Sequence, residues 1–274
     1  MGKFDGCLLA CDIDGTLIYD NFLPERNIKK IEEFVSRGGA FSLSTGRTVQ
    51  AISDVTGKIK CISPSVLSNG CVIYDFKKNR PLNEKMLSYR ALQMAERVIK
   101  EIGIGVEMHA ADIVYVPKRS HATDLHEQYE SMKPHFADIS DIKQKKINKI
   151  IYFLEDENQY KMVYNIAGDY EETSVFYNTS VYINGVKQNY IEQMPIGVSK
   201  AAALKDLCRT LNIKSGGYFA IGDYYNDIEM LKSADFSAVP CESPEDVKGA
   251  ASVVVGSASK GAVADFIEYL EEIF

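Results

Sequence analysis

The alternation of short apolar runs with amphipathic segments is the feature that most constrains how this chain can fold. Residues 7–11 form a continuous apolar run, which is typical of a strand buried on both faces of a parallel sheet. Residues 27–37 follow with apolar side chains at helical spacing, and Gly38 and Gly39 supply a stop. A second apolar run at 40–44 continues the rhythm. The pattern predicts an α/β fold with a doubly wound parallel sheet.

The rhythm changes near residues 79–81 and returns after Pro195. Between these points, strand-like runs joined by short polar connections indicate an antiparallel sheet. Helices are expected there near 88–102, 121–132 and 158–167. We therefore predict an α+β module inserted at 82–189 into a discontinuous, Rossmann-like core formed by 1–81 and 190–274.

Composition and charge narrow the classes of partner. The 274 residues are 46% apolar and 25% charged, as in a globular protein, and the formal net charge is −7. A surface of this sign repels nucleic acid and anionic membranes, so we expect neither as a partner. An anionic substrate would need local cations at its site. The sequence carries no signal of oligomeric state.

The cysteines and the N-terminus indicate the cellular compartment. Six cysteines are present without a Cys-x-x-Cys pair, and no apolar signal-peptide stretch is visible. Most of these cysteines lie in apolar runs, where a free thiol packs as a small buried hydrophobe. We expect a cytoplasmic protein in a reducing setting. The spacing of the four histidines matches no zinc motif, which favours surface or packing roles for His109, His121, His126 and His135.

Two acids, Asp12 and Asp14, follow directly on the first apolar run. Ligands of open α/β sheets bind beyond the carboxyl ends of the strands, and side chains at i and i+2 of an extended segment can project to one side. An Asx turn at the end of a strand is the structural alternative, and it would explain a lone Asp-Gly. Two unpaired acids repel each other, however, which favours a site that holds a cation between them.

A second group of acids follows the apolar run at 218–221. Asp227 and Asn226 could simply cap the helix expected at 227–233. Asp223 precedes that helix and is less easily explained as a cap. It is therefore the best candidate for a third carboxylate around a hard cation such as Mg²⁺.

Two further segments could supply groups that bind an anion. Thr45, Gly46 and Arg47 follow the second apolar run, where a hydroxyl, a flexible backbone and a guanidinium suit phosphate oxygens. An ordinary strand-to-helix turn explains them equally well. Lys200 opens a helix, and the N-terminus of a helix carries partial positive charge. For a single lysine, exposure to solvent is the commoner outcome, so only the neighbouring motifs favour a site here.

The order of these motifs resembles that of the haloacid dehalogenase-like phosphatase superfamily. The motifs are Asp-x-Asp-Gly-Thr-Leu at Asp12, Thr-Gly-Arg at Thr45, Ser-Lys at Ser199 and Gly-Asp-x-x-Asn-Asp at Gly222. The long insert between the second and third motifs is similar to that of the Cof-type sugar phosphatases, as is the segment around Asn69. The resemblance spans both ends of the chain, and four motifs in order are more specific than any one of them.

The resemblance implies a role for each acid. Asp12 would be the nucleophile that attacks phosphorus and forms an aspartyl-phosphate. Asp14 would protonate the leaving alcohol and then activate water. Mg²⁺ would be held by Asp12, the backbone carbonyl of Asp14 and Asp223. The inserted module would be a cap domain that covers the site and reads the leaving group.

Further roles are carried over from the resemblance residue by residue. The phosphoryl group would be contacted by Thr45, Gly46, Lys200 and Asn226. Supporting or specificity roles are expected for Asp227, Arg47, Asn69, Tyr224 and Tyr225. The two tyrosines stand where relatives often have a smaller residue, so their bulk could narrow the pocket or contact the leaving group.

These inferences predict a Mg²⁺-dependent phosphatase of small phosphate monoesters, with a small phosphorylated metabolite such as a sugar phosphate as its substrate. A phosphomutase of the same superfamily would use the same aspartyl-phosphate but return the phosphate to its substrate. A module that binds phosphate or metal without turnover is the non-catalytic alternative. The complete set of acid pair, lysine and third carboxylate argues against that alternative.

Overall fold

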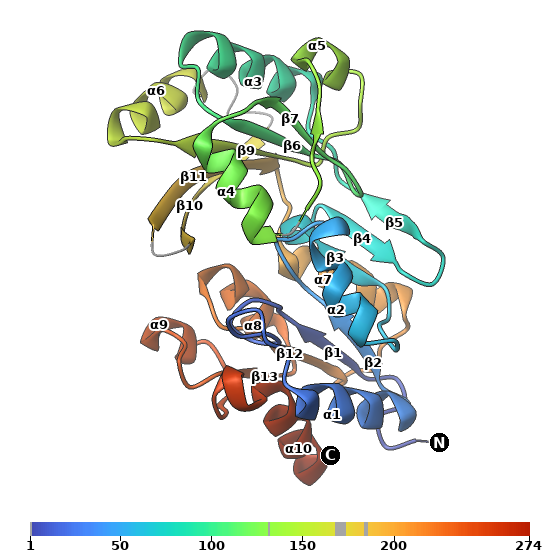
Figure 1. The fold of residues 1–274 in the computed structure, drawn as a ribbon. Helices are drawn as coiled ribbons and strands as arrows, with labels where there is room; N and C mark the ends of the chain where they lie inside the picture. The colour runs from blue at the N-terminus through green and yellow to red at the C-terminus, as the bar shows by residue number, and fades with distance from the viewer. Residues whose placement is uncertain (1, 131, 168–173, 184–185) are drawn as a thin grey trace. The chain divides into compact units, whose positions relative to one another are not determined.

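The computed structural model describes residues 2–130, 132–167, 174–183 and 186–274, which fold into two compact units (Figure 1). Unit 1 comprises Met1–Gly46, Asp54–Asn83 and Ser199–Phe274, and unit 2 comprises Arg47–Ser53 and Glu84–Val198. Among the helices within the described ranges, none has the length and apolar content needed to cross a membrane.

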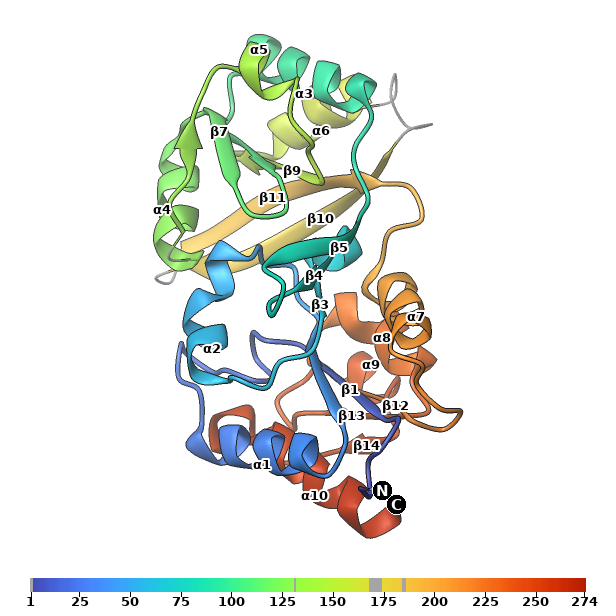
Figure 2. The same ribbon diagram turned by 90° about the vertical axis from the view of Figure 1, so that its right-hand side faces the viewer.

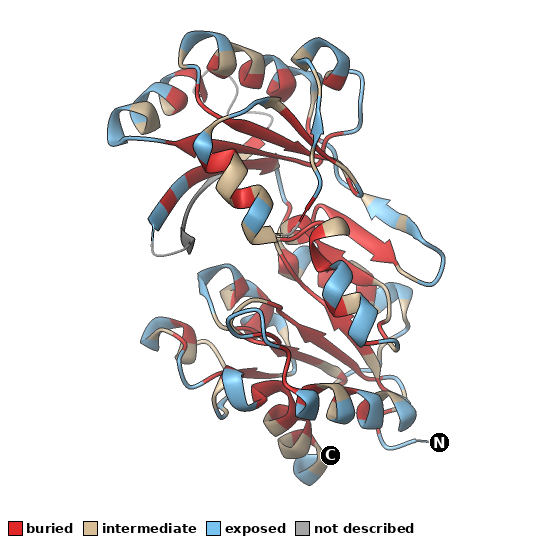
Figure 3. Ribbon diagram, in the orientation of Figure 1, coloured by how far each residue is buried: buried red, intermediate tan, exposed pale blue. Residues whose placement is uncertain are grey.

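Unit 1 is built on a five-stranded sheet with the strand order β14-β13-β12-β1-β2, in which all neighbours are parallel. Its strands are β1 (Leu8–Cys11), β2 (Ala40–Leu43), β12 (Tyr218–Ile221), β13 (Phe236–Val239) and β14 (Val253–Val254). The central strands are buried, as their apolar sequences require (Figure 3). A parallel sheet with helices on both faces confirms the predicted α/β class.

Helices cover both faces of this sheet. They are α1 (Glu25–Ser36), α2 (Ser53–Lys58), α7 (Lys200–Thr210), α8 (Ile228–Ser233), α9 (Glu245–Lys248) and α10 (Ala262–Ile273). Because successive side chains of a strand point to opposite faces, Leu8 and Ala10 share one core with Leu204 of α7 and Met230 of α8. Helices α1 and α10 lie side by side in both views (Figures 1 and 2).

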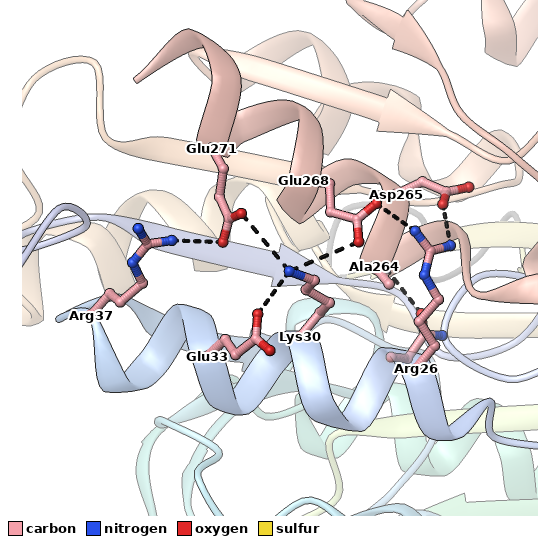
Figure 4. Close-up of polar contacts among 9 residues, drawn as sticks. Arg26, Lys30, Glu33, Arg37, Ala264, Asp265, Glu268 and Glu271 are labelled. Carbon is pink, nitrogen blue, oxygen red and sulfur yellow. Dashed lines mark hydrogen bonds and ion pairs between the residues drawn. The ribbon is translucent and has the colours of Figure 1, made fainter.

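The contact between α1 and α10 joins the two ends of the chain (Figure 4). Two cations of α1 and the residue that follows this helix pair with acids of α10, namely Arg26 with Asp265 and Glu268, Lys30 with Glu268 and Glu271, and Arg37 with Glu271. Ion pairs of this exposed kind contribute little individually. The fully buried Asn27 fixes the alignment, because its Oδ1 accepts from the Ala264 N–H at 3.0 Å and its Nδ2 donates to the Leu17 carbonyl at 3.1 Å.

A small antiparallel sheet follows the second strand of unit 1. It contains β3 (Ser65–Leu67), β4 (Val72–Asp75) and β5 (Arg80–Glu84) in that order. The alternation of strands and helices predicts another strand of the parallel sheet near β3. In the structure, β3 is linked to the main sheet only by isolated parallel bridges, such as that of Ser44 with Val66. The chain turns back at Asn69, whose φ of 56° is left-handed, and β4 then pairs antiparallel with β3.

The connections of the main sheet diverge between β1 and β12. From β1 the chain passes through α1 to β2 on one side, whereas from β12 it passes through α8 to β13 on the other side. Open α/β sheets bind ligands beyond the carboxyl ends of strands that diverge in this way.

Unit 2 is an α+β structure with a six-stranded sheet in the order β10-β11-β9-β6-β7-β8. Its strands are β6 (Val106–His109), β7 (Val114–Lys118), β8 (His135–Phe136), β9 (Lys149–Leu154), β10 (Ser174–Ile183) and β11 (Val186–Pro195). The pairs are antiparallel except for β7 with β8. This confirms the predicted α+β character. The module boundary expected at residue 189 falls inside β11, which pairs with β9 through Gln193.

The helices of unit 2 are α3 (Tyr89–Glu101), α4 (His121–Glu130), α5 (Ile139–Ile142) and α6 (Glu157–Ala167). Helices α3 and α6 pack on one face of the sheet, where Val98 and Val163 share a core with Met108. On the opposite face, Ala122 of α4 packs with Phe153 of β9.

The face that carries α4 also holds a buried polar cluster. The fully buried Glu107 carboxylate lies 3.0 Å from His109 Nε2 and 3.0 Å from His126 Nδ1. Burial raises the pKa of Glu107, but the two histidines outweigh burial and lower it to about 2. Burial lowers the pKa of His126, but Glu107 and Glu130 outweigh burial and raise it to about 9. His126 is therefore a buried imidazolium that ties α4 to β6.

We predict that Glu107→Gln makes unit 2 less stable and removes part of its pH dependence. The folded pKa of His126 is raised, so its stabilisation is complete below about pH 6.5 and is lost as pH rises through about 9. The variant should lose about 2–4 kcal/mol at neutral pH and much less at alkaline pH. Thermal unfolding measured across this range tests it, with the exposed Glu101→Gln as control. An unchanged pH profile in Glu107→Gln would contradict the assignment.

Candidate active site

Two acids from distant parts of the sequence meet beyond the carboxyl ends of β1 and β12. Asp12 follows β1 directly, and its N–H donates to the Ile221 carbonyl of β12 at 2.9 Å. Asp223 lies two residues past the end of β12. An added Cβ on Gly15 would stand 2.3 Å from Asp223 Oδ2, and Gly15 has a φ of +75°. The turn after Asp12 and the loop after β12 therefore touch, and only glycine fits between them.

The turn after Asp12 is held by its own backbone. The Ile13 carbonyl accepts from the N–H groups of Leu17 and Ile18 at 3.0 and 2.9 Å. This places the fully buried Thr16 so that its Oγ1 donates to Asp223 Oδ1 at 3.0 Å. Its partner is a carboxylate of the site, so Thr16 orients Asp223.

Lys200 is the cation at the centre of the site. It is the first residue of α7, and the Ser199 side chain caps this helix by accepting from the Ala202 N–H. The Lys200 Nζ lies 2.6 Å from Asp12 Oδ1 and 2.7 Å from Asp227 Oδ1. Lys200 is only 2% exposed, so the alternative that this lysine is an ordinary solvent-exposed side chain is wrong. A buried ammonium of this kind requires such partners.

Asp227 supports the site from beneath. Its Oδ2 accepts from the N–H groups of Asp223 and Tyr224 at 3.1 and 3.2 Å, while its Oδ1 faces Lys200. Its side chain makes no capping hydrogen bond to α8, but its bond to the Tyr224 N–H caps the short 3-10 helix η4 (Tyr225–Asp227) that leads into α8, so Asp227 is a cap as well as a partner of Lys200. An added Cβ on Gly222 would lie 2.5 Å from the Asp227 carboxyl carbon. Asp227 thus fixes the backbone that carries Asp223.

The site holds an excess of negative charge. Asp12, Asp223 and Asp227 surround one lysine. Burial raises the pKa of Asp12 well above its usual value, and the neighbouring acids add to this effect while Lys200 opposes it. Burial and Asp227 raise the pKa of Asp223 to about 7. Burial lowers the pKa of Lys200, but Asp12 and Asp227 outweigh burial and keep it above its usual range.

The arrangement suits a hard divalent cation. Carboxylate oxygens of Asp12, Asp223 and Asp227 lie within 4.8 Å of one another. Both oxygens of Asp227 already accept hydrogen bonds, whereas Asp12 and Asp223 each offer a second oxygen. Oxygen donors with surplus negative charge are the ligands that Mg²⁺ prefers. The donor set therefore fits the predicted Mg²⁺, with Asp12 and Asp223 as the better ligands.

The segment around Thr45 reaches the same edge of the sheet. The Ser44 N–H donates to the Cys11 carbonyl at 2.8 Å, which sets the nearly fully buried Thr45 beside the end of β1. The Thr45 carbonyl accepts from the Asn69 N–H at 3.0 Å, and an added Cβ on Gly46 would stand 3.1 Å from Asn69 Oδ1. Thr45, Gly46 and Asn69 therefore form one surface.

Gly70 joins this surface to the start of α7. It has a φ of +105°, and an added Cβ would lie 2.3 Å from the Ser199 carbonyl oxygen. The helix that begins at Lys200 can approach the segment of Asn69 only because residue 70 has no side chain. Sequence analysis singled out the segment around Asn69 by resemblance and did not predict this packing. A glycine after a polar turn residue was the signal that could have indicated it.

The side chains of four predicted residues take no part in these contacts. Asn226 is exposed and, among the described residues, makes none of the hydrogen bonds that join Asp12, Lys200 and Asp227. Arg47 belongs to unit 2, where its Nη1 donates to the Ala51 carbonyl at 3.0 Å. Its guanidinium also stands over the ring of Tyr129 at 5.8 Å from the ring centroid.

The other two predicted residues, Tyr224 and Tyr225, are side by side on the loop after Asp223. Their ring centroids are 5.0 Å apart and their planes are inclined by 78°. Both side chains are about half exposed, at 52% and 50%. Within the described part of the chain, neither tyrosine side chain is buried in the core.

Comparison with known proteins identifies the family. The sequence model of the haloacid dehalogenase-like hydrolase family matches residues 9–267. The chain therefore belongs to the haloacid dehalogenase-like hydrolases, which confirms the resemblance drawn from the four motifs.

The chain is also similar to known phosphatases over nearly its whole length. The 5-amino-6-(5-phospho-D-ribitylamino)uracil phosphatase YcsE of Bacillus subtilis is 25% identical over 263 residues, which cover 96% of this chain and 94% of the relative. The pyridoxal phosphate phosphatase YbhA of Escherichia coli is 22% identical over 272 residues, with 95% and 97% covered. The solved structure of the subclass IIB sugar phosphatase BT4131 has a TM-score of 0.80 at 17% identity and covers 97% of this chain and 99% of that one. The family and these relatives confirm the predicted class of enzyme, a phosphatase.

We predict that Gly15→Ala harms the enzyme more than Gly216→Ala does. The two glycines have nearly equal φ values, +75° and +74°, but only the added Cβ at Gly15 meets Asp223, whereas Gly216 faces open space. Each change should cost about 1 kcal/mol of stability from the left-handed backbone. Gly15→Ala should cost about 1–3 kcal/mol more from overpacking and should also reduce turnover. Thermal unfolding and phosphate release measure both effects; equal losses in the two variants would contradict the proposed contact.

Proposed function

We propose that this chain is a Mg²⁺-dependent phosphatase that hydrolyses small phosphate monoesters, sugar phosphates among them, through an aspartyl-phosphate intermediate. The observation that carries the proposal is the position of Lys200, which lies 2.6 Å from Asp12 Oδ1. This contact holds the Asp12 carboxylate in place, so that one of its oxygens can attack phosphorus while the other can bind the cation. The buried ammonium also supplies positive charge for the phosphoryl group.

The reaction would proceed in two steps. In the first, one carboxylate oxygen of Asp12 forms a bond to phosphorus while the bond from phosphorus to the ester oxygen breaks, and Asp14 gives its proton to the departing alkoxide. In the second, Asp14 takes a proton from water as the water oxygen attacks the same phosphorus. Phosphate leaves and the Asp12 carboxylate is regenerated. Loose phosphoryl transfer requires chiefly positioning and charge neutralisation, which a rigid group of buried residues supplies.

Asp12, Asp223 and the backbone at Asp14 would hold the Mg²⁺. A bound divalent cation stabilises negative charge on the phosphoryl oxygens. Thr45 and Gly46 would contact the same oxygens from the neighbouring strand end, and Asn69 would orient that segment. Asn226 is exposed beside the site, and its role as a phosphate contact remains a prediction.

The names of the relatives support a small phosphate monoester as the substrate. Their names cover a phosphoribityl compound, pyridoxal phosphate and sugar phosphates, which share a phosphate monoester and differ in the leaving group. We propose sugar phosphates as the class because the chain resembles the Cof-type sugar phosphatases in its motifs and shares its fold with a sugar phosphatase. Unit 2 would be the cap domain that selects the leaving group.

We predict that Asp12→Asn lowers Mg²⁺-dependent phosphate release from a generic aryl phosphate at least about a thousandfold. The amide oxygen of asparagine is a far weaker nucleophile than a carboxylate oxygen. Asparagine has nearly the size of aspartate, and its amide oxygen can still accept a hydrogen bond from Lys200. Asp206→Asn is the matched control, because the Asp206 side chain on α7 is 46% exposed and pairs with Arg209, away from the buried ion pairs of Lys200. Full Mg²⁺-dependent turnover in Asp12→Asn would show that another residue attacks.

The same assays separate the rival functions. A phosphomutase would interconvert isomers of a hexose phosphate without accumulating free phosphate. A binding module would show affinity for phosphate or Mg²⁺ and no turnover in the wild-type protein. Accumulation of free phosphate from a hexose phosphate supports the phosphatase against both.

We predict that Mg²⁺ binds more weakly as pH falls below about 7. The pKa of Asp223 in the metal-free protein is raised to about 7, so its carboxyl is protonated below this pH and must lose the proton to bind the cation. The apparent Kd should rise about tenfold per pH unit below this point and level off above about pH 8. In Asp223→Asn, binding should be weak throughout and lack this dependence. Calorimetric titration measures it, and a flat wild-type profile would contradict the role of Asp223.

A further inference from the structure

The buried floor of the site sets the direction in which the leaving group departs. Asp12 is 7% exposed, and Lys200 and Asp227 beneath it are almost completely buried. In phosphoryl transfer the attacking oxygen and the leaving oxygen are roughly in line through phosphorus. Because Asp12 attacks from the floor, the leaving group must point outward, past the exposed residues around the site. This step depends on the proposed function.

Exposed aromatic side chains follow two of the site's carboxylates in the sequence. In the described part of unit 1 the exposed aromatic residues are Tyr19, Phe22, Tyr224, Tyr225 and Phe274. Phe274 is the last residue and packs edge-on against Phe219 at 4.8 Å. The other four lie on two loops, one after Asp14 and one after Asp223. These loops touch through the hydrogen bond from Thr16 to Asp223.

The tyrosine pair stands on a rigid support. The Tyr224 N–H donates to Asp227 Oδ2 at 3.2 Å, and the same oxygen accepts from the Asp223 N–H at 3.1 Å. Asp227 is itself anchored by Lys200 and is fully buried. The backbone of Tyr224 is thus tied to the group that holds the nucleophile. The two rings are exposed, so they do not serve the core as packing residues. Exposed aromatic side chains on a fixed backbone are suited to binding a ligand.

We propose that Tyr224 and Tyr225 select phosphate esters whose leaving group contains a ring over esters of open-chain alcohols. Two rings inclined at 78° give one flat face and one edge, which suit a flat apolar ring surface. The C–H face of a pyranose and the face of a heteroaromatic ring both offer such a surface. An open-chain polyol has no flat face and would lose conformational freedom on binding.

The test compares glucose 6-phosphate with sorbitol 6-phosphate, which have the same carbon number and differ in having a ring. Pyridoxal 5′-phosphate is the aromatic probe and separates a preference for sugar rings from one for heteroaromatic rings. The ratio of kcat/KM for cyclic over open-chain substrate should favour the ring in the wild type. In Tyr224→Leu/Tyr225→Leu this ratio should fall about tenfold, through KM and not through kcat.

Two controls separate ring stacking from other causes. Tyr224→Phe/Tyr225→Phe keeps the rings and should keep the ratio. Phe274→Leu removes an aromatic side chain of similar exposure, 48%, at the far end of the chain and should leave the ratio unchanged. Thermal unfolding of each variant verifies that the fold is intact.

Other outcomes would overturn the inference. Equal losses for cyclic and open-chain substrates in the leucine variant would mean that the tyrosines serve loop stability or a contact with unit 2. A wild-type ratio near one would also refute it, although phosphate release from both substrates would leave the proposed function standing. Hydrolysis of no ester at all would remove the proposed function itself.

Discussion

The buried ion pairs of Lys200 with Asp12 and Asp227 are the interaction on which the rest of the site depends. Three carboxylates, two of them buried, are held close together, and like charges repel strongly where water is largely excluded. The lysine offsets part of this repulsion, and it also links the first motif to the last. Buried charges are stable only when they pair with an opposite charge at hydrogen-bonding distance. The ion pair with Lys200 therefore fixes the position of the Asp12 carboxylate. The remaining negative charge is what a divalent cation would complete.

The topology of the sheet explains why these groups meet. Residues 12 and 223 are far apart in the chain, but they follow the adjacent parallel strands β1 and β12 at their carboxyl ends. Helix α7 begins at the same edge because Gly70 lets its first turn approach the segment of Asn69. Glycines at 15, 70 and 222 are therefore part of the site, since each makes room for a neighbouring loop or carboxylate.

Part of this arrangement follows from the sequence, and part does not. Asp12 and Asp223 were predictable because acids after buried strands have few structural explanations, and Lys200 because the neighbouring motifs supported it. The contact of Asp227 with Lys200 was not, because the spacing of Asp227 suited a helix cap equally well. Arg47 was assigned by its place in a motif, yet its side chain turns toward Ala51 and Tyr129. The pairing of Glu107 with His126 joins a strand to a later helix, and local patterns carry no signal for such contacts.

Covalent capture of the intermediate tests the central claim most directly. In Asp14→Asn, which would lack the acid–base group for the second step, the aspartyl-phosphate should accumulate when a reactive aryl phosphate and Mg²⁺ are supplied. Rapid acid quenching, digestion and mass spectrometry would then locate the phosphoryl group. The account predicts that it is attached to Asp12, with no label in Asp12→Asn/Asp14→Asn. Phosphorylation of another residue, or turnover of an active wild-type enzyme without any covalent phosphoryl group under the same quench, would contradict it.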